Sequence, residues 1–327
     1  MRIKGGRILS GLLIILVVIV VYTFWDNNRI KIVEQDIAIE DLPQQFEEFQ
    51  ILQVTDLHEK QFGKDQRKLV KAINAIEYDV LVFTGDMLDD TQSSNFTSFY
   101  SVLDGIDNKE HILYVPGNAD PYSYNTEPVF GKSEFINGLE DRGVTFLESI
   151  ETVSIDSANL HFVDFELSIA KDEKFVGKNT GIVKPPYSSD ASYRKYQQQL
   201  WEELTVLNEF NNSDIVIALN HYPIVDNRIE FIMKDPNRVW RDYDLIMAGH
   251  YHGGQFRIPF LGALFVPEAW YEPNSFFPPT DRVKGLWEYK DTQQYVSAGL
   301  GSSDAIPLLK FRLFNPPEIN VLKLIRK

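Results

Sequence analysis

Cysteine is absent from the 327 residues of the chain. The chain therefore has neither a disulfide framework nor a thiolate zinc site, although this absence fits either side of a membrane. Basic residues are also outnumbered, because 32 Lys and Arg stand against 47 Asp and Glu, a formal net charge of −15. A nucleic-acid surface needs clustered Lys and Arg, so no nucleic-acid partner is expected. An anionic substrate would have to be held locally, by metal ions or by a few basic residues.

One long uncharged run occupies the N-terminus, over residues 8–25. Its roughly 18 residues are near the lower limit for crossing a bilayer as a helix. Three basic residues precede it and three aromatic residues end it: Arg2, Lys4 and Arg7, then Tyr22, Phe24 and Trp25. Basic residues on the cytoplasmic side and aromatic residues at the interface are typical of a membrane-spanning helix.

A cleavable signal peptide is the alternative for this run. The small-x-small cleavage pattern is missing before Asp26, which favours an uncleaved signal anchor. We therefore expect residues 1–25 to form a basic cytoplasmic tip and a single transmembrane helix. The positive-inside rule then places the rest of the chain outside the cytoplasm, at the cell membrane.

Residues 26–45 are polar and mixed, and we expect a linker there, followed by one domain over residues 46–327. Strand-like apolar runs alternate with longer segments of helical spacing. The expected strands include 49–55, 79–84, 111–115, 160–164, 215–219 and 243–248, and the expected helices 63–77, 94–103, 129–141 and 191–210. Residues 167–190 are expected to form a loop. This order predicts an α/β domain with a β-sandwich flanked by helices.

Five of the apolar runs end in side chains that can bind a metal ion. The blocks are Asp56-Leu-His58, Gly85-Asp86, Gly117-Asn118, Asn-His221 and Gly249-His250-Tyr-His252. Taken singly, each has an ordinary explanation as a turn, a cap or a core histidine. Together they supply three Asp or Asn oxygens and four imidazoles, which is enough for two adjacent divalent ions.

Two such ions can clamp the attacking and leaving oxygens of a displacement at phosphorus, so the blocks indicate metal-assisted phosphoester hydrolysis. Asp86 follows a glycine that lets the backbone turn sharply, and its carboxylate can bridge two cations. A mixed set of imidazole and carboxylate ligands suits Mn, Fe, Zn or Co. We favour two manganese ions.

The chain resembles the calcineurin-like metallophosphoesterase superfamily, whose pattern is Asp-x-His, Gly-Asp, Gly-Asn-His, His and Gly-His-x-His. Three further segments are similar to its membrane-associated bacterial branch: Asp-Leu-His-x-x-x-Phe62-Gly63, Gly-His-x-His-Gly-Gly-Gln255 and Gly299-Leu-Gly301-Ser. The resemblance implies a four-layered α/β sandwich, in which two packed mixed β-sheets are flanked by helices.

The resemblance also implies a division of the ligands between two metals. Asp56, His58, Asp86 and His252 would hold one ion, and Asp86, Asn118, His221 and His250 the other. Asp86 and a hydroxide would bridge the two ions, and the hydroxide would attack phosphorus. Asp86 and Asn118 are thus expected to take part in catalysis as well as in metal binding.

Ala119 departs from the superfamily pattern, which has histidine after Gly-Asn and assigns it to protonating the leaving oxygen. General acid catalysis contributes typically ~10²–10⁴-fold, and alanine cannot supply it. Three alternatives remain: substrates with good leaving groups, a substitute acid, or a metal-binding protein with feeble catalysis. Asp120 is the adjacent candidate for the substitute, and His111 and His161 are more distant ones.

Three other features have two explanations each. Arg257 either pairs with a substrate phosphate or is a solvated surface residue, and the aromatic segment 261–287 either faces lipid or packs as an irregular loop. Asp89 and Asp90 are expected to be a solvated loop end.

The sequence therefore predicts a membrane-anchored phosphoesterase that acts on phosphodiesters or phosphomonoesters, with phosphorylated envelope or lipid-linked substrates favoured by the anchor. The alternative is a non-catalytic or weakly active metal-binding module at the cell surface.

Overall fold

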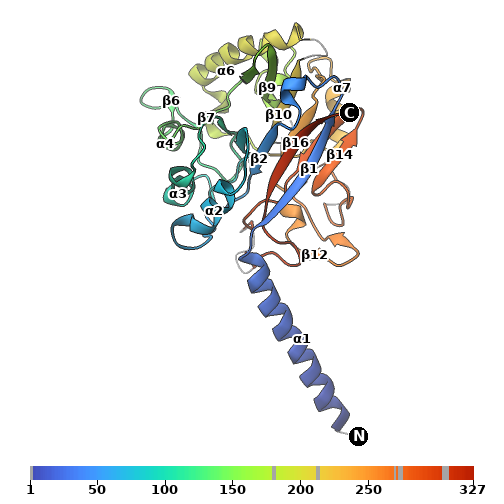
Figure 1. Ribbon diagram of the computed structural model, residues 1–327. Coiled ribbons are helices and arrows are strands. Elements are labelled where there is room, and N and C mark those ends of the chain that lie inside the picture. Colours follow the sequence, from blue (N-terminus) through green and yellow to red (C-terminus); the bar gives the residue numbers. More distant parts are fainter. Residues whose placement is uncertain (1–2, 179–181, 211–213, 269, 272–274, 304–308) are drawn as a thin grey trace.

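The computed structural model describes residues 3–178, 182–210, 214–268, 270–271, 275–303 and 309–327. Arg2, part of the expected basic tip, lies outside these residues. Helix α1 (Ile3–Asn27) projects from the domain as a separate rod (Figure 1). Its segment Ile8–Asn27 is long and apolar enough to cross a membrane. The apolar part is exposed, whereas Asp26 and Asn27 at its end are buried against the domain.

The first sheet has six strands in the order β1-β16-β2-β3-β4-β7. Their bounds are Lys31–Ile39 (β1), Glu318–Arg326 (β16), Gln50–Val54 (β2), Val80–Phe83 (β3), Ile112–Tyr114 (β4) and Thr145–Phe146 (β7). Strands β2, β3, β4 and β7 are parallel, and β16 runs antiparallel to β2. Apolar residues of α2 (Arg67–Asn74), α3 (Thr97–Gly105) and α4 (Glu134–Glu140) form a core cluster against this sheet.

The second sheet also has six strands, in the order β14-β15-β11-β10-β9-β8. Their bounds are Gly285–Tyr289 (β14), Thr292–Val296 (β15), Leu245–Ala248 (β11), Ile215–Leu219 (β10), Ala158–Asp164 (β9) and Ile150–Ile155 (β8). Its outer face packs on α5 (Phe165–Ser168), α6 (Ala191–Glu203) and α7 (Asp226–Lys234). Two short hairpins, β5–β6 (Tyr124–Asn125, Gly131–Lys132) and β12–β13 (Arg257–Ile258, Gly262–Ala263), complete the strands.

A third apolar cluster fills the space between the two sheets, with residues from both. Strand β10 is buried at all five positions because its two faces are covered, one by this cluster and one by helices. The molecule is thus layered helix, sheet, sheet, helix. The predicted four-layered α/β sandwich and its apolar N-terminal helix are confirmed.

Residues 26–45 differ from the expected linker, because they contain strand β1. Strand β1 pairs with β16 in parallel register from Lys31 to Ile39, and Ile37 and Ile39 are buried. It is an edge strand whose other face carries charged residues, so its sequence has the polar composition of a tether. Only residues 28–30 separate α1 from the sheet. The expected loop 167–190 likewise contains ordered turns, at Glu173–Phe175 and Pro186–Ser189.

Strand β1 provides a test of this correction, because Ile37 is fully buried whereas Ile32 in the same strand is 43% exposed. We expect Ile37→Ala to lower the free energy of unfolding of the full chain by about 2–5 kcal/mol, the usual cost of such a cavity. Ile32→Ala should change it by roughly 0.5 kcal/mol or less. Denaturant unfolding in detergent, followed by tryptophan fluorescence, measures both. Equal small effects would mean that the segment is a tether after all.

Candidate metal centre

All seven predicted ligands lie on loops that leave the carboxyl ends of five strands. Asp56 and His58 follow β2, Asp86 follows β3, and Asn118 follows β4 in the first sheet. In the second sheet His221 follows β10, and His250 and His252 follow β11. Because these strands are parallel within each sheet, their ends meet at one edge of the sandwich. The loops therefore bring together residues that are far apart in the sequence.

The side chains form two overlapping clusters that could each hold a metal ion. One contains Asp56, His58, Asp86 and His252, and the other Asp86, His221 and His250, with the ligand atoms of each cluster within 4.8 Å of one another. Asp86 belongs to both. The same carboxylate oxygen, Oδ2, lies 3.5 Å from His58 Nε2 and 3.1 Å from His221 Nε2. The Asp and His members of the two clusters are those that the resemblance divides between two ions. Asn118 is in neither cluster, and its role as a ligand stays a prediction.

Unpaired polar atoms show that the centre suits a cation. Both ring nitrogens of His58, Nδ1 of His252 and Oδ1 of Asn118 are buried atoms without a hydrogen-bond partner. Each such atom costs about 1–3 kcal/mol when left unsatisfied. Metal ions in the clusters would engage one ring nitrogen of each histidine together with the oxygen atoms, and the mixed donor set fits Mn, Fe, Zn or Co.

The pKa values of the centre follow from burial and from mutual charge. Burial raises the pKa of Asp56 to about 6. Burial also acts to raise the pKa of Asp86, but the charge and hydrogen bond of His221 outweigh it and hold this pKa below its usual range. Burial acts to lower the pKa of His221, yet Asp86 raises it to about 9. Burial and the charge of His221 lower the pKa of His250 to about 3. Burial thus opposes charge on Asp56 and His250, and a bound cation would favour the ionised carboxylate and the neutral imidazole.

Two glycines let the loop after β3, which carries Asp86, approach the loop after β4 closely. Gly85 has a φ of +88°, and a Cβ atom there would lie 2.4 Å from the backbone nitrogen of Gly117. A Cβ atom on Gly117 would lie 2.1 Å from Asp86 Oδ1. The Ala119 N–H instead donates to that oxygen over 2.7 Å and orients the carboxylate. A side chain at either glycine would therefore displace Asp86.

Asp120 ties the same two loops together. Its carboxylate accepts hydrogen bonds from the backbone N–H groups of Asp86 (2.8 Å), Met87 (2.8 Å) and Gly117 (2.9 Å), and from the hydroxyl of Tyr114 (2.8 Å). Both oxygens are thus engaged in holding backbone. This geometry favours a positioning role for Asp120, and its use as a substitute acid stays a prediction.

The two histidines outside the motifs lie away from the centre. His111 immediately precedes β4, whose other end leads to Asn118. His161 Nδ1 lies 2.9 Å from Thr152 Oγ1, and its ring packs on Phe210 with centroids 4.3 Å apart. His111 lies at the end of β4 that is opposite to Asn118, and His161 lies inside β9. Neither imidazole is therefore placed to do the work of a histidine at position 119.

Asp89 has a role that its sequence context did not reveal. It was expected in a solvated loop end, but Asp89 Oδ1 lies 3.7 Å from His58 Nδ1, and Oδ2 accepts a hydrogen bond from Lys310 Nζ at 2.6 Å. A carboxylate behind a ligating histidine fixes the orientation of the ring. The partner Lys310 is 221 residues away in the chain, so no local motif signals this contact.

Arg312 is the second residue that the sequence did not indicate. It is fully buried, and its guanidinium donates to the carbonyls of His252 (3.0 Å), Ala298 (2.6 Å), Gly301 (2.7 Å) and Asn315 (2.8 Å). Burial lowers its pKa to about 10, so the group stays charged at neutral pH. Arg257, considered as a phosphate ligand, donates to the Gly253 carbonyl over 2.8 Å and supports the same turn.

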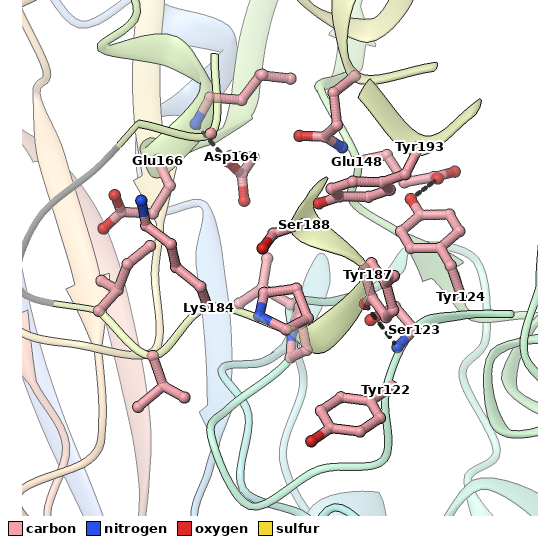
Figure 2. A pocket seen from close by; sticks show the side chains of 18 of the residues that line it. Tyr122, Ser123, Tyr124, Glu148, Asp164, Glu166, Lys184, Tyr187, Ser188 and Tyr193 are labelled. Atoms are coloured by element: carbon pink, nitrogen blue, oxygen red, sulfur yellow. Dashed lines mark hydrogen bonds between the residues drawn. The ribbon is translucent and has the colours of Figure 1, made fainter. Parts of the chain in front are cut away.

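A cavity of about 460 Å³ adjoins the centre on the Asn118 side. Tyr124, Tyr187 and Tyr193 gather on one side of it, and Lys184 and Glu166 lie on the other (Figure 2). Its lining also includes Asn118, whose neighbour Ala119 donates to Asp86, so the cavity lies next to the metal centre. The space can receive a group attached to a phosphorus atom at the centre.

Comparison with known proteins points to one family. The family model of calcineurin-like phosphoesterases matches residues 49–254. The uncharacterized metallophosphoesterase YkuE of Bacillus subtilis is 23% identical over 92% of this chain and 87% of its own length. The phosphodiesterase YaeI of Escherichia coli is 27% identical over 85% of this chain and 82% of its own. The UDP-2,3-diacylglucosamine pyrophosphatase LpxG of Chlamydia muridarum is 22% identical, with 84% and 82% covered.

The shared position of Asp86 gives a test of the two-metal centre. The full-length chain, purified and loaded with Mn²⁺, should contain two ions per chain by elemental analysis, and Asp86→Asn should lose both because each cluster needs this carboxylate. Manganese at about 100 times its Kd should add ~2.7 kcal/mol to the stability of the unmodified chain. Asp90→Asn, the same change on an exposed neighbouring loop residue, should behave as the unmodified chain does. Two ions in Asp86→Asn would contradict the shared-ligand geometry.

Proposed function

Because the chain belongs to the calcineurin-like phosphoesterase family, we propose that it is a membrane-anchored hydrolase of phosphodiesters or phosphomonoesters in envelope or lipid-linked substrates. The observation that carries this proposal is the pair of buried clusters sharing Asp86, with their unpaired donor atoms. Manganese is the favoured metal. The apolar helix α1 supports the anchor, and the basic residues before it favour a catalytic domain outside the cytoplasm.

The residues of the centre have separable roles in this hydrolysis. Two bound divalent ions would activate water and neutralise charge on the phosphoryl oxygens. Asp86 is held between the ion positions by the Ala119 N–H, and Asp120 fixes the two loops around it. The Nδ1 of His221 lies 2.8 Å from the Thr84 carbonyl, which turns Nε2 toward Asp86. In the overall reaction, water adds to phosphorus and the P–O bond to the leaving alcohol breaks.

Alanine at position 119 cannot donate a proton to the leaving oxygen, and this limits which substrates can be hydrolysed fast. Four of the six histidines in the sequence are in the centre, and His111 and His161 lie away from it. No imidazole is therefore left to protonate the leaving oxygen. This favours esters and anhydrides whose leaving group is stable as an anion. The activities named for YaeI and LpxG, a phosphodiesterase and a pyrophosphatase, support the same range of substrates.

A metal-binding module with weak or no catalysis is the alternative function. Ala119 is the observation that favours it, since the metal ligands would be kept while the acid is lost. The buried centre alone agrees with both functions. Rates must separate them.

We expect the full-length chain with Mn²⁺ to hydrolyse bis(p-nitrophenyl) phosphate, because nitrophenolate needs no proton to leave. Asp86→Asn should reduce the rate to that of buffer with Mn²⁺, and Asp90→Asn should keep it. Release of nitrophenolate is followed by absorbance. Negligible rates in a folded chain shown to hold two metal ions would instead support the metal-binding module.

Restoring histidine should reveal the missing acid. In an active enzyme, Ala119→His should raise the hydrolysis of an alkyl phosphate ester by up to ~10²–10⁴-fold, the range of general acid catalysis. The rate for the nitrophenyl ester should change much less, because its leaving group needs no proton. The ratio of kcat/KM for the two esters in both variants gives the result. No gain with either ester would count against the leaving-group argument.

A further inference from the structure

A second cavity lies between helix α1 and the domain and borders the metal centre at His58. Its volume is about 760 Å³, and its wall runs from Leu16, Val20 and Phe24 of α1 to His58 and Phe311. His58 is a member of the first metal cluster. The cavity therefore connects the apolar helix with the metal centre.

The helix contributes one continuous stripe to this cavity. Leu16, Val20 and Phe24, with Ile19, Thr23 and Asn27 beside them, recur every three or four residues and so lie on one face of α1. At 1.5 Å per residue, Leu16 is about 12 Å further along the helix than Phe24. If Phe24 and Trp25 lie at the membrane interface, the cavity extends about 12 Å into the hydrocarbon layer.

The end of α1 is linked to the metal centre through Arg312. Asn27 Nδ2 donates to the Arg312 carbonyl over 2.7 Å, and the Arg312 N–H donates to Asn27 Oδ1 over 2.8 Å. The guanidinium of the same Arg312 holds the carbonyl of His252. Tyr22 also packs on Phe314, with ring centroids 5.6 Å apart. The cavity is thus a built feature of the fold.

The domain also exposes apolar side chains at the end from which α1 leaves. Phe260 and Leu261, in the turn between β12 and β13, are fully and largely exposed. Figure 1 shows β12 at the end of the domain from which α1 leaves. Exposed aromatic and aliphatic side chains beside a membrane-spanning helix suit contact with lipid.

The two ends of the cavity differ in polarity. The helix end is apolar, whereas the end near His58 is lined by charged residues of both signs, Lys60 and Lys310 with Glu59 and Asp89. Lys60 Nζ donates to the Leu300 carbonyl over 3.3 Å, and Lys310 pairs with Asp89 behind His58. An occupant that matches both ends has a hydrocarbon chain and a polar phosphoester head, whose charge would be met by metal ions bound in the cluster that includes His58.

We propose that this cavity binds the hydrocarbon chain of a membrane lipid phosphoester, which enters from the bilayer along α1 and places its phosphate beside His58. The inference rests on the proposed function, because it names the substrate class of the same centre. Water adds to phosphorus, the P–O bond to the second substituent breaks, and that substituent leaves as an alcohol or its anion. The cavity on the Asn118 side would receive the leaving substituent.

Two diesters with the same leaving group test the proposal: methyl p-nitrophenyl phosphate and hexadecyl p-nitrophenyl phosphate. The full-length protein is studied in lipid nanodiscs with Mn²⁺, and the readout is the ratio of kcat/KM for hexadecyl over methyl. We expect a ratio of at least roughly ten, because burial of only a few methylene groups shifts binding by this factor.

Val20 and Val21 provide a matched pair of variants, because both are exposed on α1 but only Val20 lines the cavity. Val20→Trp should fill the cavity and lower the hexadecyl-to-methyl ratio at least several-fold. Val21→Trp should keep the ratio and the rates of the unmodified protein. If the two variants have the same ratio, the preference comes from partition into the bilayer and the proposal fails.

A binding readout without turnover completes the test. A hexadecyl phosphate carrying a photoreactive diazirine in its chain should label Phe311 or Leu313, and Val20→Trp should reduce this labelling while Val21→Trp should not. Labelling confined to lipid-facing residues outside the cavity would overturn the proposal. Failure of the enzyme assignment is recognised separately, by the absence of metal-dependent hydrolysis of the methyl ester in a chain that holds two metal ions.

Discussion

The structure depends on one electrostatic constraint, the burial of two carboxylates and four imidazoles around a shared point. Buried charges are stable only when they are paired or bind metal. Pairing within the chain is incomplete, since His221 and Asp86 favour each other's charged forms while burial raises the pKa of Asp56 and lowers that of His252. Metal ions would remove this conflict. The residues around the centre must then hold the ligand side chains in the positions and orientations that metal binding requires.

That framework is made mainly of buried polar groups that bind backbone. Asp120 joins the loops after β3 and β4 within the first sheet. Arg312 joins the turn after β11 to the segment after β15, and so links the second sheet to the C-terminal part of the chain. A buried guanidinium with four carbonyl partners satisfies its donors in a way that an apolar residue could not. Loss of the Asp120 carboxylate or of the Arg312 guanidinium would therefore loosen the loops that carry the ligands, although no ligand itself would be removed.

Sequence patterns pointed to the side chains that the fold gathers into the two clusters, because each of them stands in a local motif. Gly85-Asp86 and Gly249-His250-Tyr-His252 follow apolar strands and contain the glycine that a close backbone approach needs. The layers of the fold were likewise predictable from alternating strands and helices. Strand β1 was missed because an edge strand with one charged face looks polar. Asp89 and Arg312 were missed because their partners are distant in the sequence, and only tertiary packing brings them together.

The strand that replaced the expected linker changes how the anchor relates to the chemistry. A flexible tether of about twenty residues would let the domain face any direction, with an average reach of roughly 25 Å. Here only residues 28–30 lie between α1 and β1, and Asn27 is bonded to the arginine that supports His252. The metal centre therefore has one orientation relative to the helix axis. The proposed binding of a lipid chain along α1 depends on this fixed orientation, because the cavity has one wall on the helix and the other on the domain.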